Sequence, residues 1–345
     1  MEGGPISVRD PAVVSTIDGL IQQVGEAPEG FRGQLLREMV QSCLRLAGDG
    51  AGTGELKLFS RSLKELRYGM KVFRPYRATP KISIFGSART PPGHPHYEAA
   101  LRFSRAISAA GWMVITGAGD GIMRAGHGGA GREASFGVAI RLPFETNANE
   151  FIVGDDKLVT FRYFFTRKLM FVSQADAVAL FPGGFGTHDE GFEVLTLIQT
   201  GKTPIIPLVM VDAPGERYWA EWDRYVRGHL LDTGMISPED LNLYLVTDDT
   251  ERAMRYVLDF YRNYHSMRFV RDDLVIRVRR PLPAALLDRV QGEFADLVAE
   301  GSMQQGGPLE GEGADESPEL PRLWFTFTRR SYGRLRLMID RLNEA

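Results

Sequence analysis

Three glycine-rich stretches of this sequence hold residues that are suited to bind an anion. They are FGSART at 85–90, TGAGDGIM at 116–123 and PGGFGTHDE at 182–190, and each follows an apolar run and leads into a segment with helical periodicity. Backbone N–H groups at a helix start, with no Cβ atom in front of them, form a site for a phosphate or another anion. A single loop of this kind could be a tight turn, but three at one sheet edge favour anion binding.

The spacing of the glycines favours a single phosphate over a dinucleotide. Gly117, Gly119 and Gly121 do not have the G-x-G-x-x-G spacing. The next predicted strand, 135–142, carries Arg141 near its end and no acid that could hold a ribose hydroxyl. The sequence also has no G-x-x-x-x-G-K-[ST] loop for a nucleoside triphosphate.

Glu190 and Arg167 are charged residues near these loops, and each has a structural as well as a chemical explanation. Thr187-x-x-Glu190 fits a capping box, in which both side chains satisfy N–H groups at a helix start. A capping box does not require three glycines before it, and a carboxylate fixed in this way could also act on a substrate. Arg167 lies beside Lys168 in the aromatic segment 161–171, which predicts a largely buried helix. A buried guanidinium needs a carboxylate or phosphate partner.

Alternating strands and helices must position these residues. Continuous apolar strands that alternate with helices predict a doubly wound, parallel α/β sheet that is covered on both faces, with ligands at the carboxyl ends of the strands. We expect a helical N-terminal extension at 1–79, which could be a helical wrap or an oligomer contact, an α/β core at 80–264, and a small α/β appendage at 265–345. The acidic, glycine-rich segment 306–319 predicts a mobile loop. The predicted core strands lie at 81–87, 112–117, 135–142, 157–161, 176–181 and 204–211, and the appendage is expected to contain strands at 274–280 and 320–327 and helices at 283–301 and 332–343.

The composition excludes several classes of protein. The 345 residues are 43% hydrophobic with a formal net charge of -3, so no basic field indicates a nucleic-acid or membrane partner. Cys43 is the single cysteine, which excludes an internal disulfide and a Cys-rich metal site. His94, His96 and His127 lack a second cluster at ligand spacing, so we expect no metal. His188 lies in the third glycine stretch and could line the pocket, although exposure is favoured. With neither a signal peptide nor a long apolar run, the expected location is the cytoplasm.

The motifs resemble those of the Lonely Guy (LOG) family, whose members were long labelled lysine decarboxylases. PGGFGTHDE matches the family signature PGGxGTxxE, and TRK at 166–168 matches its Arg-Lys motif at the family's offset. FGSART resembles the first phosphate loop of the family, TGAGDGIMRAG resembles its second, and the segment 175–209 is similar throughout. The resemblance covers about residues 80–262, and the extensions are typical of the longer bacterial members.

The resemblance implies a modified Rossmann-like fold for the core at 80–264 and hydrolysis of a nucleoside 5′-monophosphate to a free base and ribose 5-phosphate. The expected substrate is AMP or an N6-modified AMP, as in cytokinin-activating relatives, with no cofactor, and the expected assembly is a homodimer or a higher homo-oligomer. The expected catalytic residues are Arg167 and Glu190. The expected substrate-binding residues are Gly86, Ser87, Gly117, Gly119, Gly121, Met123, Lys168, Gly183, Gly184, Gly186 and Thr187.

The chemistry of an N-glycosidic bond agrees with these residues. Its cleavage develops oxocarbenium character on the ribose, which an ionised Glu190 could stabilise while it orients or deprotonates the attacking water. Arg167 would hold Glu190 and the ribose hydroxyls in place. A lysine decarboxylase would need a Schiff-base lysine for pyridoxal phosphate, and nothing marks Lys168 for that role. The alternative is a non-catalytic carrier of a nucleotide or a molybdopterin-type cofactor, which would need the phosphate loops but not Arg167 and Glu190 together.

Overall fold

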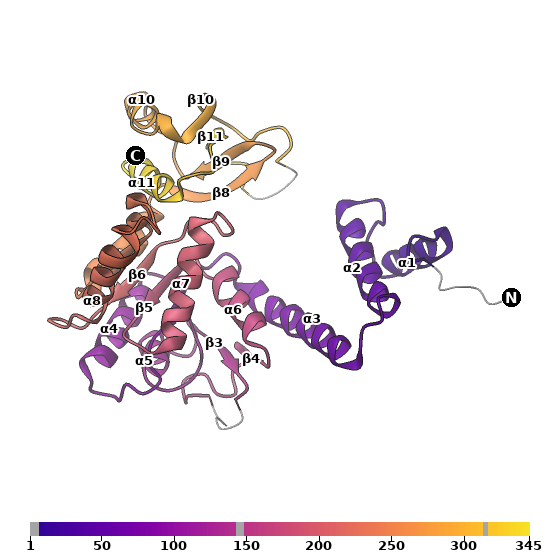
Figure 1. Ribbon diagram of the computed structural model, residues 1–345, viewed down its shortest axis with the longest axis horizontal. Helices are drawn as coiled ribbons and strands as arrows, with labels where there is room; N and C mark the ends of the chain where they lie inside the picture. The colour runs from indigo at the N-terminus through magenta and orange to yellow at the C-terminus, as the bar shows by residue number, and fades with distance from the viewer. Residues whose placement is uncertain (1–6, 143–147, 313–316) are drawn as a thin grey trace. The chain divides into compact units, whose positions relative to one another are not determined.

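The computed structural model describes residues 7–142, 148–312 and 317–345, which form two compact units (Figure 1). The first unit extends to Arg67 and contains the helices α1 (Pro11–Gln23), α2 (Phe31–Gly48) and the first part of α3 (Thr53–Phe73). Asp10 caps α1 by accepting the Ala12 N–H at 2.8 Å, and Pro11 occupies the first helical position. The N-terminal segment is therefore helical, as its periodicity predicts.

The second unit, Tyr68–Ala345, is built around a seven-stranded sheet in which every pair of neighbouring strands is parallel. The strand order is β4-β3-β2-β1-β5-β6-β7. The predicted α/β class and the six predicted core strands are confirmed, and β7 is an additional edge strand. The strands are β1 (Lys81–Phe85), β2 (Met113–Thr116), β3 (Ser135–Ile140), β4 (Leu158–Phe161), β5 (Ala177–Leu180), β6 (Leu208–Val211) and β7 (Tyr244–Thr247).

Helices cover both faces of this sheet, so its central strands are buried along their whole length. In β1, Ile82 and Ile84 belong to the core beneath α4 (Pro95–Ala109), α5 (Ile122–Ala130) and α9 (Thr250–Phe260). Phe85 points to the opposite face, where its ring lies 4.7 Å from that of Phe171 in α6 (Phe164–Ser173). The helix α7 (Phe185–Gln199) packs on that same face, because Gly191 lies against Leu180 of β5. Alternate residues of one strand therefore enter two different cores.

The chain order of the strands reverses between β1 and β5. From β1 the chain adds β2, β3 and β4 outward on one side, and it then returns to place β5 against the other side of β1. The helices that follow the two strands diverge there, which leaves a crevice at their carboxyl ends. The loops 86–90 and 182–184 leave the sheet at this point.

The C-terminal appendage forms a second, antiparallel sheet of order β10-β11-β9-β8 within the same compact unit. The helix predicted at 283–301 is wrong in its second half: α10 ends at Glu293, and β10 begins at Val298. β8 was not predicted either. Residues 313–316 of the acidic segment lie outside the described residues. The elements are β8 (Tyr264–Val270), β9 (Asp273–Val278), α10 (Ala284–Glu293), β10 (Val298–Gly306), β11 (Arg322–Phe327) and α11 (Tyr332–Leu342).

Candidate active site

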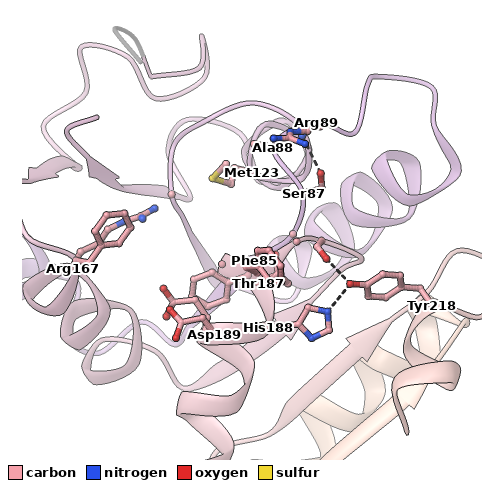
Figure 2. A pocket seen from close by; sticks show the side chains of 18 residues that line it. Phe85, Ser87, Ala88, Arg89, Met123, Arg167, Thr187, His188, Asp189 and Tyr218 are labelled. Carbon is pink, nitrogen blue, oxygen red and sulfur yellow. Dashed lines mark hydrogen bonds between the residues drawn. The ribbon is translucent and has the colours of Figure 1, made fainter. Parts of the chain in front are cut away.

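A cavity of about 820 Å³ lies at the carboxyl ends of β1, β2 and β5, and all three predicted glycine loops line it (Figure 2). Both predicted catalytic residues, Arg167 and Glu190, also line it. The structure therefore brings together residues that are up to 104 positions apart in the chain, from Gly86 to Glu190. The other predicted residues on the wall are Ser87, Gly117, Met123, Gly183, Gly184, Gly186 and Thr187.

The three glycines of the third loop are present for different reasons. A Cβ atom on Gly183 would lie 2.1 Å from the Thr187 Oγ1, so the fold itself requires glycine there. Cβ atoms on Gly184 and Gly186 would meet no atom within 4 Å, and neither position has a positive φ. Both residues line the cavity. The folded chain therefore does not require glycine at 184 and 186, which is the pattern expected where a ligand approaches the backbone.

The first turn of α7 leaves backbone N–H groups unpaired at the wall of this cavity. α7 begins at Phe185, its N-cap is Gly184, and no side chain caps it. Among the residues that the structure describes, none accepts a hydrogen bond from the N–H of Phe185 or Gly186. The predicted capping box at Thr187 and Glu190 is therefore wrong, because the N-cap lies three residues earlier, at Gly184, and Glu190 lies in the second turn of the helix. The exposed start of α7 is suited to bind an anion.

The first loop contributes fewer free donors than its sequence suggests. The Ser87 N–H donates to the Pro182 carbonyl at 3.1 Å, and the Ser87 carbonyl accepts the Ile122 N–H at 3.0 Å. A Cβ atom on Gly121, whose φ is +61°, would lie 2.2 Å from the Ser87 carbonyl oxygen. These contacts fasten the three loops together. Gly121 therefore supports the site without lining the cavity.

Glu190 is a buried acid on the cavity wall. The residue is 7% exposed, and its Oε2 atom has no hydrogen-bond partner within the described part of the chain. Burial raises the pKa of its carboxyl from 4.5 to about 7, although the charges of Lys168 and Arg167 oppose that rise. The acids Asp189 and Glu193 add to it. A carboxyl with this pKa exchanges its proton close to neutral pH.

Lys168 lies beside these acids and is not among the residues that line the cavity. Its Nζ atom is 2.6 Å from the Glu193 Oε2, 3.0 Å from the Asp189 Oδ2 and 3.8 Å from the Glu190 Oε2. The nearest ion pair of Glu190 is therefore with Lys168 and not with Arg167. We expect Lys168 to act on a ligand mainly through the charge of Glu190.

Arg167 lies on one side of Thr187 and Asp189 in the cavity wall, and Tyr218 lies on the other (Figure 2). Its Nε–H donates to the Val138 carbonyl at 2.9 Å, and its guanidinium carbon lies 5.1 Å from the centre of the Phe171 ring. A Cβ atom on Gly117 would lie 2.4 Å from its Nη2. Glycine at 117 therefore makes room for this guanidinium. The surrounding helix is less buried than predicted, because the outer face of α6 is exposed.

A second cavity, of about 490 Å³, lies on the far side of Arg167 and shares Gly117, Met123 and Phe164 with the first. The predicted residue Gly119 lines this second cavity only. The two cavities together provide room on both sides of the Arg167 guanidinium.

The wall also contains Arg89 and Tyr218, which were not among the predicted site residues, and His188, which lines the cavity although exposure was favoured. His188 is half-buried, and its Nε2 lies 2.6 Å from the Tyr218 hydroxyl. That hydroxyl donates to the Gly183 carbonyl. Arg89 places a further cation on the wall next to Ser87. Tyr218 begins α8 (Tyr218–Tyr225), beyond β6, and no motif in the sequence marks it.

The comparisons with known proteins match this core. The sequence profile of a family described as "Possible lysine decarboxylase" matches residues 120–257. The cytokinin riboside 5′-monophosphate phosphoribohydrolase of Mycobacterium tuberculosis is 30% identical over 161 residues, which are 46% of this chain and 83% of that relative. The chain belongs to the LOG family.

Solved structures with a similar course of the chain include two proteins that bind the molybdenum cofactor. The cofactor-binding protein of Rippkaea orientalis is 16% identical with a TM-score of 0.36, and it matches over 52% of this chain and 96% of its own. The carrier protein of Chlamydomonas reinhardtii is 20% identical with a TM-score of 0.35, over the same shares of the two chains. At these scores the likeness says nothing about the ligand of the present LOG protein.

The described residues hold neither a metal cluster nor a membrane-spanning helix. Within residues 7–142, 148–312 and 317–345, no group of three or more His, Cys, Asp and Glu side chains could hold a metal ion. In the same part of the chain, no helix is both long and apolar enough to span a bilayer.

Proposed function

We propose that this LOG protein hydrolyses the N-glycosidic bond of a purine nucleoside 5′-monophosphate, AMP or an N6-modified AMP, to give the free base and ribose 5-phosphate. The observation that carries the proposal is the shared wall of the cavity. One part of this wall is the start of α7, which has free N–H donors and two glycines that the fold does not require. Beside it lies the buried carboxyl of Glu190, whose pKa is about 7. The first feature suits a phosphate, and the second suits proton transfer.

The phosphate would bind at the start of α7. The N–H groups of Phe185 and Gly186 would donate to its oxygens, and the positive end of the helix would favour its charge. Arg89, on the same wall, would add a cation. Binding energy from this remote group would then position the reacting bond.

Glu190 would act on the ribose. Its carboxylate form would stabilise the positive charge that develops at C1′ and would accept a proton from the attacking water. A pKa near 7 suits a general base, because the group is substantially ionised at neutral pH and still binds a proton well. Arg167, fixed by Val138 and Phe171, would orient the ribose hydroxyls or the leaving base between the two cavities.

The exposed apolar side chains next to the cavity support a homodimer. Phe164, Phe165 and Leu169 of α6 and Phe185 and Phe192 of α7 are all exposed, and Phe185 is 96% exposed. We propose that a second copy covers this α6–α7 face and closes one side of the site. Large exposed apolar side chains that lie together mark interaction surfaces.

The test of the function is a comparison of AMP with adenosine. We expect AMP to release adenine and ribose 5-phosphate, and adenosine to react at least a hundredfold more slowly, because it lacks the group that the α7 start would bind. Chromatography of the free base measures both rates. If the protein binds AMP without turnover, the carrier hypothesis takes the place of this proposal. Equal values of kcat/KM for the two compounds would remove the phosphate site from the mechanism.

A further inference from the structure

The helix α3 carries an apolar seam with the spacing of a coiled coil. Leu56, Phe59, Leu63 and Leu66 follow one another at intervals of three, four and three residues. Alternation of three and four gives a repeat of 3.5 residues, which keeps one stripe in register with a second helix. Met70 continues the pattern where α3 enters the second unit.

Within the first unit, the described residues leave most of this seam uncovered. Every residue of α3 from Thr53 to Lys64 is exposed except Ser62, which is half-buried. Phe59 and Leu63 are 53% and 52% exposed. An amphipathic helix gains most of its stability when its apolar face packs against another surface. The seam is therefore a helix face without a partner among the described residues of its own unit.

The rest of the first unit also buries few apolar side chains and exposes many. Its buried apolar side chains within the described residues are Ile17 and Ile21, a very small core for a unit of this length. Eleven large apolar side chains of the unit are more than a third exposed. They are Leu20, Val24, Phe31, Leu35, Met39, Val40, Leu44, Leu56, Leu58, Phe59 and Leu63.

We infer that this surface binds the same surface of a second copy of the chain, with the α3 seams of the two copies packed against each other. The exposed parts of the eleven side chains amount to on the order of 1,000 Å² per copy, at roughly 150–200 Å² for each full side chain. A standard interface takes about 800 Å² from each partner. The first unit therefore exposes, in total, about as much apolar area as one side of such an interface needs.

The charges of the unit also fit a second copy better than a charged partner. Residues 7–67 contain eight Lys and Arg and eight Asp and Glu, so two copies do not repel each other through a net charge. Ser60 and Ser62, which flank the seam, are uncharged. The charged residues Arg61 and Lys64 lie on the outer side of the repeat, away from the seam.

The test must separate this contact from the proposed α6–α7 interface. The full-length variant Phe165→Gln/Leu169→Gln removes two exposed apolar side chains of α6 and serves as the background. In that background we compare Phe59→Gln/Leu63→Gln with the matched control Arg61→Gln/Lys64→Gln. Gln is a good helix former and adds no charge. Circular dichroism checks that all three proteins remain folded, and light scattering after size exclusion measures their molar masses.

The background protein and the control are expected to remain dimers, and the seam variant is expected to have half their mass. Two results would overturn the inference. One is a background protein that already runs as a single chain, which would leave the seam to a different partner. The other is a seam variant that keeps the mass of the control, as it would if α3 packed within its own chain. A further variant, Phe59→Leu, keeps an apolar seam and should stay dimeric.

Discussion

Glu190→Gln removes a proton-binding group from the cavity while it keeps the size and shape of the side chain. Because the carboxyl has a pKa of about 7 in the folded protein and 4.5 in the unfolded chain, folding disfavours its charged form. At about 1.36 kcal/mol per pKa unit, the carboxyl lowers the free energy of unfolding by roughly 3 kcal/mol at a pH where it is ionised in both states. The residue is 7% exposed, so solvent screens this cost little.

The sign of the stability change follows from the two pKa values. Below pH 4.5 the carboxyl is protonated in both states, and the cost is absent. Between pH 4.5 and about 7 the unfolded chain loses the proton first, so the free energy of unfolding falls as the pH rises. Gln cannot ionise. The free energy of unfolding of Glu190→Gln should therefore match that of the wild type near pH 4.5 and exceed it by about 3 kcal/mol at pH 8.

The same substitution should reduce turnover. Loss of the carboxylate removes both charge stabilisation and the proton acceptor, so kcat for AMP should fall by about a hundredfold or more. For the wild type, kcat/KM should rise with pH through about pH 7, as the carboxyl ionises. Binding of AMP should remain, because the start of α7 is unchanged.

Urea unfolding at several pH values and initial rates of adenine release measure both effects. Glu193→Gln is the matched control, since Glu193 lies on the same helix, contacts the same Lys168 and does not line the cavity. It should show neither the gain in stability at high pH nor the loss of kcat. A Glu190→Gln protein with normal turnover would refute the catalytic role of Glu190. If the free energy of unfolding of this variant depended on pH as that of the wild type does, the raised pKa of the buried carboxyl would be refuted.

Three other substitutions test separate parts of the structure. Gly186→Ala should stabilise the first turn of α7 by about 0.5–1 kcal/mol, because Ala favours the helix. It should nevertheless weaken AMP binding at least tenfold, as measured by calorimetry. Unchanged affinity would show that no ligand approaches the backbone at this position. Tyr218→Phe removes the hydrogen bonds of its hydroxyl to the Gly183 carbonyl and His188. A loss of about 1 kcal/mol of binding free energy should raise KM for AMP roughly fivefold. The melting temperature should stay within a few degrees of the wild-type value. Glu312→Ala leaves the fully buried Arg322 without its carboxylate at 2.9 Å and should destabilise the protein by about 3–5 kcal/mol in urea; a normal midpoint would show that the pair contributes nothing.

The sequence by itself determined the parallel sheet and the place of the three glycine-rich loops. Continuous apolar runs such as 177–180 indicate strands that are covered on both faces, and the parallel sheet follows from their alternation with helices. The carboxyl ends of such strands share one edge, so the three glycine stretches could be placed together from the order of the residues alone. These inferences need only local patterns and a topological rule.

Only the tertiary structure decided the chemical state and the neighbours of the site residues. The spacing of Thr187 and Glu190 fits a capping box, but α7 starts at Phe185, because the chain leaves β5 in a conformation that makes Gly184 the N-cap. Glu190 is thereby placed one turn further into the helix and against the core, where burial raises its pKa.

The same limit explains the missed elements. Tyr218 reaches Gly183 across 35 residues, and the segment 298–306 becomes a strand because β11 offers its edge for pairing. A capping pattern or a helical period is a property of neighbouring residues in the chain. Burial, cross-strand pairing and the distance between charges depend on residues that only the folded chain brings together, and they decide whether a Glu caps a helix or lies buried with a raised pKa.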